Sequence, residues 1–191
     1  MAKERRFEKR SYLRYIQRSA SGDYVYTGGY WSLQGGAYGA FLKKTFAFCA
    51  PAAAAVIAAG VLPNPAMTFG GPYAVTFTAF YVVIPYILEL AFTGSVVWAA
   101  LRLVSNEKPL REYVYKATVP RFSLRCILAA AAAGLTAAGE TVFLILHGAS
   151  GQAGFIALAY VLHACVPALM LLLRRFVNAS VWRFTAEKPK G

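Results

Sequence analysis

The sequence predicts an all-α, polytopic membrane protein with four transmembrane helices, both termini in the cytosol, and an amphipathic interfacial helix ahead of the first span. Two observations carry this prediction: the chain contains four long apolar stretches, and all 20 Lys and Arg residues fall outside them. Composition agrees, because 58% of the 191 residues are hydrophobic and only 15% are charged, as expected for a chain that spans a bilayer.

The four apolar stretches cover residues 45–62, 73–101, 126–146 and 155–173. A bilayer core about 30 Å thick is crossed by about 20 helical residues, and shorter or longer stretches are accommodated by tilt or local thinning. The first and third stretches are rich in Ala and Gly, and Ala130, Gly134 and Ala138 repeat at a four-residue spacing. This spacing is typical of closely packed membrane helices, so we expect the first and third helices to be the inner ones.

The basic residues predict the orientation of the helices. Nine precede the first stretch, six lie in residues 102–125, and five follow the fourth, whereas the connections 63–72 and 147–154 carry no charge. The positive-inside rule then places both termini and the loop 102–125 in the cytosol, most simply at the cell membrane. We therefore divide the chain into a cytosolic segment (1–44), a transmembrane domain (45–173) and a cytosolic tail (174–191).

The second and fourth stretches are bulkier, and each contains one proline, Pro85 or Pro167, that we expect in the middle of its span. A proline leaves free the carbonyl four residues before it, here that of Tyr81 or His163. The similar arrangement of the two halves fits a duplicated helical hairpin. The alternative is that short Ala-rich and Leu-rich helices resemble one another by composition alone.

The N-terminal segment predicts a helix over residues 4–19 that lies along the membrane surface. Four arginines recur every four residues and share one helical arc, with apolar residues opposite, a pattern typical of interfacial helices. They are candidate contacts for anionic lipid headgroups; a solvated basic tail is the alternative. Lipid also accounts for the net charge of +12 without a nucleic-acid partner. The four residues are Arg6, Arg10, Arg14 and Arg18.

Two shorter elements are expected outside the membrane. Aromatic residues flank a Thr-Gly-Gly turn within residues 24–33, which predicts either a short hairpin or an aromatic anchor at the interface. Within the loop 102–125, a short helix is expected over residues 110–117, between Pro109 and Pro120.

Three side chains with acid–base chemistry lie inside the predicted spans, one on each of three helices: Glu89, Glu140 and His163. Counted from the first basic residue of each helix, they lie roughly 16 to 22 Å from the cytosolic edge at 1.5 Å per residue, near the middle of the bilayer. Tyr86 and Tyr160 share helix faces with them and complete a candidate polar site.

The predicted site has two interpretations. A carboxyl in a low-dielectric site without a cationic partner favours its protonated form, and two such groups with a neutral imidazole can exchange protons for a cation, as in a transporter or channel. Alternatively, each protonated carboxyl donates a hydrogen bond to a neighbouring helix and only holds the bundle together. Transport requires the three side chains to converge on a water-filled cavity, and it is excluded if Glu89 and Glu140 lie on opposite outer faces or are buried in separate dry contacts.

No common enzymatic motif is present in the sequence, and two histidines offer few ligands for a catalytic metal. We therefore expect neither a cofactor nor a metal, although Glu89, Glu140 and His163 could in principle share a divalent ion. The leading hypothesis is a non-enzymatic integral membrane protein that acts through lipid and protein contacts, as a homo-oligomer or as a subunit of a membrane complex. The alternative is a small proton- or cation-coupled transporter or channel that uses Glu89 and Glu140.

Overall fold

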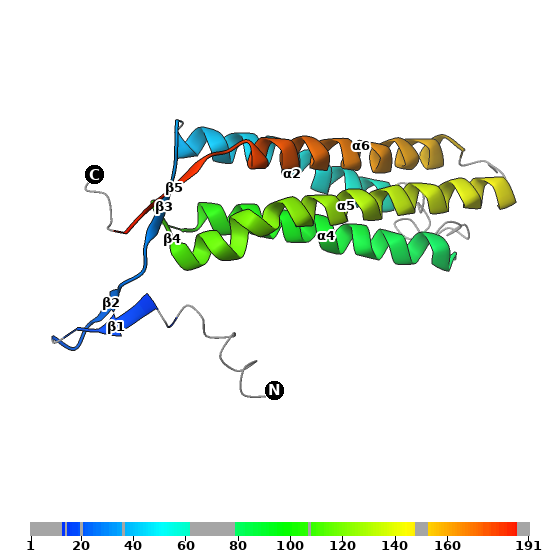
Figure 1. Cartoon of the computed structure of the whole chain (residues 1–191). Helices are drawn as coiled ribbons and strands as arrows, with labels where there is room; N and C mark the ends of the chain where they lie inside the picture. Colours follow the sequence, from blue (N-terminus) through cyan, green and yellow to red (C-terminus); the bar gives the residue numbers. More distant parts are fainter. Residues whose placement is uncertain are drawn as a thin grey trace.

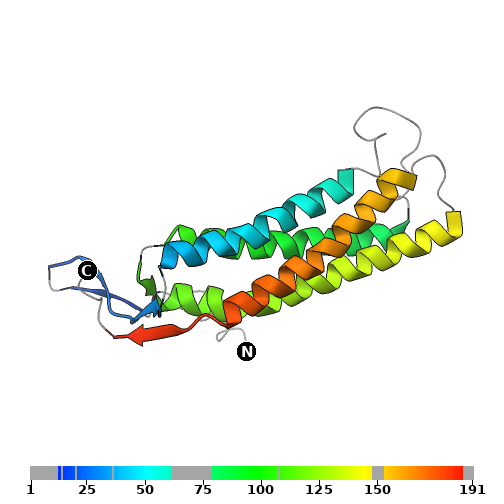
Figure 2. The same cartoon turned by 90° about the horizontal axis from the view of Figure 1, so that it is seen from above.

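The computed structural model describes residues 13–186, apart from residues 14, 20, 36, 62–78, 107 and 148–152. The described chain is mostly helical, and four of its helices are long and apolar enough to cross a membrane. This architecture is compatible with a multi-pass membrane protein. The helices are α2 (Tyr38–Val61), α4 (Phe80–Val104), α5 (Glu112–His147) and α6 (Ala153–Asn178), which lie side by side in an elongated bundle (Figures 1 and 2).

Each helix of the bundle packs against two others. Helix α4 contacts α5, α5 contacts α6, α6 contacts α2, and α2 contacts α4, which closes a four-helix ring. Every helix therefore has one face toward the core and one face outward. The first and third helices, which we expected to be the inner ones, are the more buried: 33% of the α2 span and 44% of the α5 span are buried, against 22% for α4 and 28% for α6. The predicted Ala130, Gly134 and Ala138 stripe does not line a buried contact, because Gly134 and Ala138 are exposed.

A close contact between two helix backbones involves a different glycine. Gly139 of α5 is buried, and a Cβ atom added there would collide with the backbone carbonyl oxygen of Tyr81 in α4. Only a residue without a side chain allows the two backbones to approach this closely. The carbonyl of Tyr81 is also the one that Pro85 leaves without its usual helical donor.

The prolines sit differently from the prediction. Pro167 lies well inside α6, but α4 begins at Phe80, so Pro85 lies in its second turn and not in mid-span. Helix α5 begins at Glu112 and continues through Pro120, so the separate short helix expected over residues 110–117 is not formed. An internal proline costs a helix about 3 kcal/mol, and burial of Val114, Val119 and Phe122 beside it offsets that cost.

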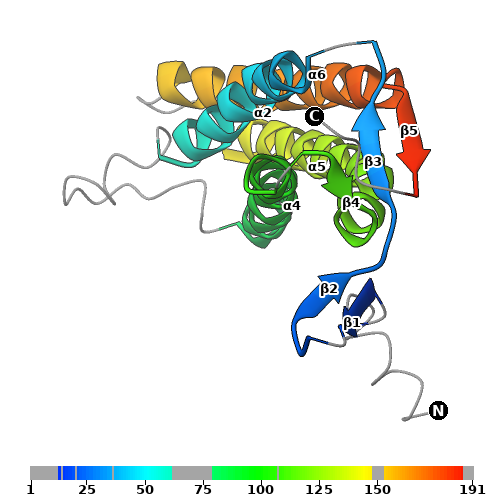
Figure 3. The ribbon, with the colours of Figure 1, turned by 90° about the vertical axis from the view of Figure 1, so that its left-hand side faces the viewer.

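A three-stranded antiparallel sheet covers one end of the bundle (Figure 3). Its order is β4-β3-β5, with β3 (Tyr30–Leu33) between β4 (Leu110–Arg111) and β5 (Trp182–Thr185). Trp31 is paired with Leu110 on one side and with Phe184 on the other. Each strand comes from one of the three basic segments, so these segments meet at the same end of the bundle.

A second, two-stranded sheet lies beyond the first. Strand β1 (Ile16–Arg18) pairs with β2 (Tyr24–Tyr26) in antiparallel register. The helix predicted over residues 4–19 is therefore wrong at its C-terminal end, because the aromatic strand β2 offers Ile16–Arg18 a pairing partner. Arg18 lies in β1, whereas Arg6, Arg10 and Arg14 lie outside the described residues.

The hairpin expected within residues 24–33 is also corrected. Both strands form, but β2 pairs with β1 and β3 pairs with β4 and β5. Side-chain packing explains the choice for β3, since Trp31 stacks on Tyr115 of α5 with ring centroids 4.0 Å apart. Next to this pair, Trp182 meets the rings of Phe41 and Tyr38 of α2 edge-on. Aromatic contacts thus join the sheet to the helices.

Candidate functional site

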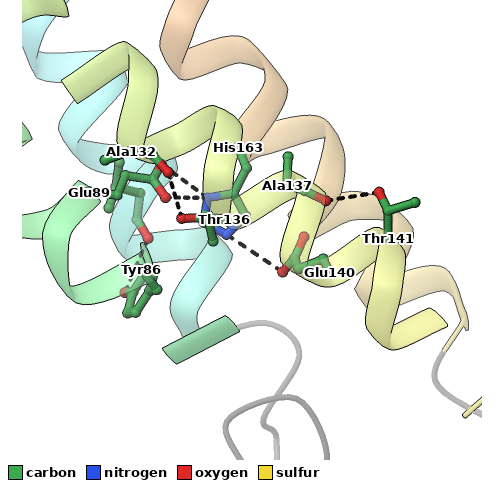
Figure 4. Close-up of polar contacts among 9 residues, drawn as sticks. Tyr86, Glu89, Ala132, Thr136, Ala137, Glu140, Thr141 and His163 are labelled. Carbon is green, nitrogen blue, oxygen red and sulfur yellow. Dashed lines mark hydrogen bonds and ion pairs between the residues drawn. The ribbon is translucent and has the colours of Figure 1, made fainter. Parts of the chain in front are cut away.

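His163 lies between two glutamates inside the bundle. Its Nδ1 atom is 3.0 Å from Oε1 and 2.8 Å from Oε2 of Glu89 on α4. Its Nε2 atom is 3.6 Å from Oε1 of Glu140 on α5. The three ionisable side chains predicted inside the spans, one each from α4, α5 and α6, therefore converge in one chain of polar contacts (Figure 4).

The three side chains are almost fully buried. The exposed fraction is 0% for Glu89, 1% for His163 and 2% for Glu140. The described parts of the helices bring no Lys or Arg within ion-pair distance of either carboxyl. Burial of a carboxylate without a charged partner is costly. The neutral arrangements of the site are therefore favoured: two protonated carboxyls with a neutral imidazole, or one carboxylate paired with a protonated imidazole.

The two carboxyls approach His163 from different depths. Helices α4 and α5 run antiparallel, with the carbonyl of Ser95 accepting a hydrogen bond of 3.1 Å from Nη1 of Arg125. Glu89 lies six residues from Ser95 toward the far end of the bundle, and Glu140 lies fifteen residues from Arg125 in the same direction. The nine-residue difference corresponds to about 13 Å along the helix axis at 1.5 Å per residue.

This offset corrects the sequence analysis, which placed the three residues at a single depth. Counting from the first basic residue of each helix ignores how far each helix extends beyond the bilayer. The glutamate side chains extend toward each other, and the imidazole ring fills the space between them (Figure 4). The chain Glu89–His163–Glu140 is therefore elongated along the axis of the bundle.

The two tyrosines of the predicted site lie in different surroundings. The ring of Tyr86 meets the His163 ring edge-on, with centroids 6.0 Å apart, and its hydroxyl donates a hydrogen bond of 3.3 Å to the carbonyl of Val56 in α2. Through Tyr86, helix α2, which contributes no ionisable residue, also supports the site. Tyr160, by contrast, is 41% exposed on the outer surface of α6.

Two buried threonines lie one helical turn from the glutamates. Thr93 lies one turn from Glu89 and is 2% exposed, and Thr136 lies one turn from Glu140 and is 1% exposed. The Thr136 hydroxyl donates to the carbonyl of Ala132 at 3.0 Å. Thr93 Oγ1 is buried without a hydrogen-bond partner among the described residues, as are one oxygen of Glu140 and the hydroxyl of Tyr81. Such groups in a protein interior commonly bind water or take part in function.

Sequence reasoning missed the contribution of Tyr81 and Gly139. Pro85 indicated that the carbonyl of Tyr81 is free, but only the register of α4 against α5 shows that this carbonyl lies against Gly139, next to Glu140. No local pattern in either segment encodes that register.

The geometry does not favour a metal shared by the three ionisable residues. The two nitrogens of the His163 ring face different carboxyls, so the three groups do not converge on one point. Among the described residues, no group of three or more His, Cys, Asp or Glu side chains could hold a metal ion. The arrangement is instead suited to holding and moving protons.

The fold and the site together define a class: four apolar helices compatible with a multi-pass membrane protein, with a buried Glu–His–Glu chain in their core. Comparisons of the chain with protein-family models, with curated proteins and with solved structures found no match. The argument for a function therefore rests on the residues themselves.

Proposed function

We propose that this protein is a small, non-enzymatic membrane transporter that exchanges protons for a monovalent cation through Glu89, His163 and Glu140. One observation carries the proposal: a buried imidazole joins two buried carboxyls from two other helices. Ionisable residues inside membrane spans are expensive, and those that face the bundle interior typically mark proton or ion pathways. In this proposal the chain lies in the cell membrane with both termini in the cytosol.

The proton step follows from the two ring nitrogens. When His163 carries its proton on Nδ1, that N–H donates to the Glu89 carboxylate. Its Nε2 faces Oε1 of a protonated Glu140 at 3.6 Å, so the two atoms must approach by a few tenths of an ångström before Glu140 donates. Transfer of the Glu140 proton to Nε2, and of the Nδ1 proton to Glu89, moves one proton past the ring. The imidazole stays neutral and changes its tautomer, Glu140 becomes the carboxylate, and Glu89 becomes the acid.

The net charge of the site couples the binding of a proton to the binding of a cation. Both states of this transfer carry one negative charge, which is unfavourable in a buried site. Either a further proton or a cation neutralises it. The two therefore compete for one site, and this competition is the physical basis of exchange.

Proteoliposomes test this proposal. Vesicles loaded with K⁺ or Na⁺ are diluted into cation-free buffer, and a pH-sensitive dye in the lumen reports proton uptake driven by the outward cation gradient. We expect uptake well above that of protein-free vesicles, and loss of at least tenfold of that rate in Glu89→Gln and in Glu140→Gln. Tyr160→Phe is the matched control, because Tyr160 is exposed outside the polar chain.

The same variants separate transport from a purely structural role. Gln keeps hydrogen-bonding groups at both positions but cannot accept and release a proton. Folded Gln variants with no proton uptake support the proposal. Wild-type protein without cation-driven uptake in either salt, or Gln variants as active as wild type, would overturn it.

A second candidate is a subunit of a larger membrane complex or a homo-oligomer. Strand β5 is at an edge of its sheet, and Phe184 and the preceding Val181 are 48% and 59% exposed. An edge strand with exposed apolar side chains can pair with a strand of a partner. Purification in a mild detergent would then yield a stoichiometric partner or an oligomer, whereas a monomer would count against this role.

A further inference from the structure

We infer that a polar cluster on α5 and α6, at the end of the bundle that carries the sheet, binds the phosphate of an anionic phospholipid through Arg174, Ser123 and Asn178. This inference does not depend on the proposed transport function. It also differs from the N-terminal arginines predicted to contact lipid, most of which lie outside the described residues.

The three side chains form one polar cluster across the two helices. Nε of Arg174 donates to Oγ of Ser123 at 3.0 Å, and Nδ2 of Asn178 lies 3.5 Å from the same oxygen. These contacts use Ser123 as an acceptor and hold the guanidinium group in place. Among the described residues, the terminal nitrogens of Arg174 and the hydroxyl proton of Ser123 have no hydrogen-bond acceptor, so they are available as donors to one anion.

The charge of Arg174 has no counterion in the described part of the protein. Four carboxylate side chains are described there: Glu89 and Glu140 contact His163, Glu112 pairs with Lys116, and Asp23 accepts from Ser21. Arg174 is partly buried, and a partly desolvated cation gains most from a close anion. A phosphate matches the guanidinium fork in geometry as well as in charge.

Other cations occupy similar positions at neighbouring helix junctions. Nζ of Lys44 lies 5.8 Å from the ring centre of Phe176 between α2 and α6, and Arg125 reaches the carbonyl of Ser95 between α5 and α4. These residues and Arg174 form a belt around the bundle near the sheet. A belt of this kind is expected at the headgroup level of a bilayer.

Exposed apolar residues next to the polar cluster favour a lipid over free phosphate. Ile127 of α5 and Leu171 of α6 are 38% and 48% exposed, and each lies about one helical turn farther from the sheet than Ser123 or Arg174. A phospholipid whose phosphate binds the polar cluster would lay its acyl chains along these side chains. A free phosphate would gain nothing from them.

Native mass spectrometry of the purified protein tests the inference. Delipidated protein in detergent is mixed with phosphatidylglycerol or with phosphatidylcholine of the same acyl chains, and bound lipid is counted. We expect phosphatidylglycerol to bind about tenfold more tightly, and Arg174→Gln and Ser123→Ala to remove most of that preference. Arg183→Gln is the control, because it removes the same charge from exposed β5.

Two further arms make each outcome decisive. Arg174→Lys keeps the positive charge but loses the planar set of N–H donors, so it should retain only part of the preference for phosphatidylglycerol. The same variant replaces Arg174→Gln if Arg174→Gln does not fold. Inorganic phosphate at millimolar concentration should not displace the lipid. Equal binding of both lipids, an unchanged preference in Arg174→Gln, or full displacement by phosphate would overturn the inference.

Discussion

Nδ1 of His163 contacts both carboxyl oxygens of Glu89, although the two residues are seventy-four positions apart in the chain. The contact joins α6 to α4, and the opposite nitrogen of the same ring faces Glu140 on α5. One imidazole therefore connects three helices, through a hydrogen bond with Glu89 and a longer contact with Glu140. The bundle and the proton site depend on each other.

Replacement of His163 by Asn should destabilise the bundle. Asn is too short to reach both carboxyls, so at least one buried carboxyl loses its partner, at a cost of about 1–3 kcal/mol. Unfolding of the purified protein in detergent, followed by circular dichroism, measures the loss. Tyr160→Phe should leave the unfolding midpoint unchanged, and a His163→Asn variant as stable as wild type would contradict the structural part of this account.

A protonated carboxyl should be visible in the folded protein at neutral pH. Glu140 is 2% exposed, and one of its oxygens lacks a hydrogen-bond partner in the described structure, so the neutral acid is favoured over a buried charge. Infrared difference spectra between neutral and alkaline pH should show the carbonyl stretch of a protonated carboxyl, and Glu140→Gln should remove or shift it. Absence of that band both from the difference spectrum and from the wild-type minus Glu140→Gln spectrum at neutral pH would indicate that Glu140 is ionised.

The contact between Gly139 and Tyr81 should tolerate no side chain. In Gly139→Ala the added methyl would meet the carbonyl of Tyr81, and relief requires α4 and α5 to separate, at a cost of about 1–3 kcal/mol. Because Glu140 is the next residue, its contact with His163 should weaken as well. Unfolding in detergent and proton uptake in vesicles measure the two effects.

Gly134→Ala is the matched control in the same helix. A Cβ atom at Gly134 has no atom within 4 Å, and Ala is favoured over Gly in a helix by up to about 1 kcal/mol. This variant should therefore be as stable as wild type or slightly more stable. The opposite ranking of the two variants would show that the described register of α4 against α5 is wrong.

These two glycines show what the sequence could and could not predict. The four long apolar helices were predictable because length and apolar composition are local properties, and the three ionisable residues stood out against that background. The spacing of Ala130, Gly134 and Ala138 indicated a tight contact, but the contact is at Gly139. Which side of a helix faces a neighbour depends on all four helices together, and no window within one helix contains that information.

The sheet was harder to predict for a related reason. Its central strand pairs residues near position 31 with Leu110 and Phe184, so the partners are distant in the chain. Strand β4 has only two residues, too few for a periodic signal. We expected the aromatic residues of 24–33 to form a hairpin or an interfacial anchor. They form two strands that do not pair with each other, and the partners of β3 follow from its packing against α5.

The sheet also leads to a prediction of topology. Because β3, β4 and β5 meet at one end of the bundle, we predict that the three basic segments from which they come lie on one side of the membrane, and the positive-inside rule predicts that this side is cytosolic. In a variant whose three cysteines are replaced by serine, Ser150→Cys in the outer connection should react with an impermeant maleimide added to right-side-out vesicles. Ser105→Cys, an exposed residue just after α4, should react only in inside-out vesicles. Reversed labelling would reverse the orientation, and reaction of both sites from one side would exclude the four-span topology.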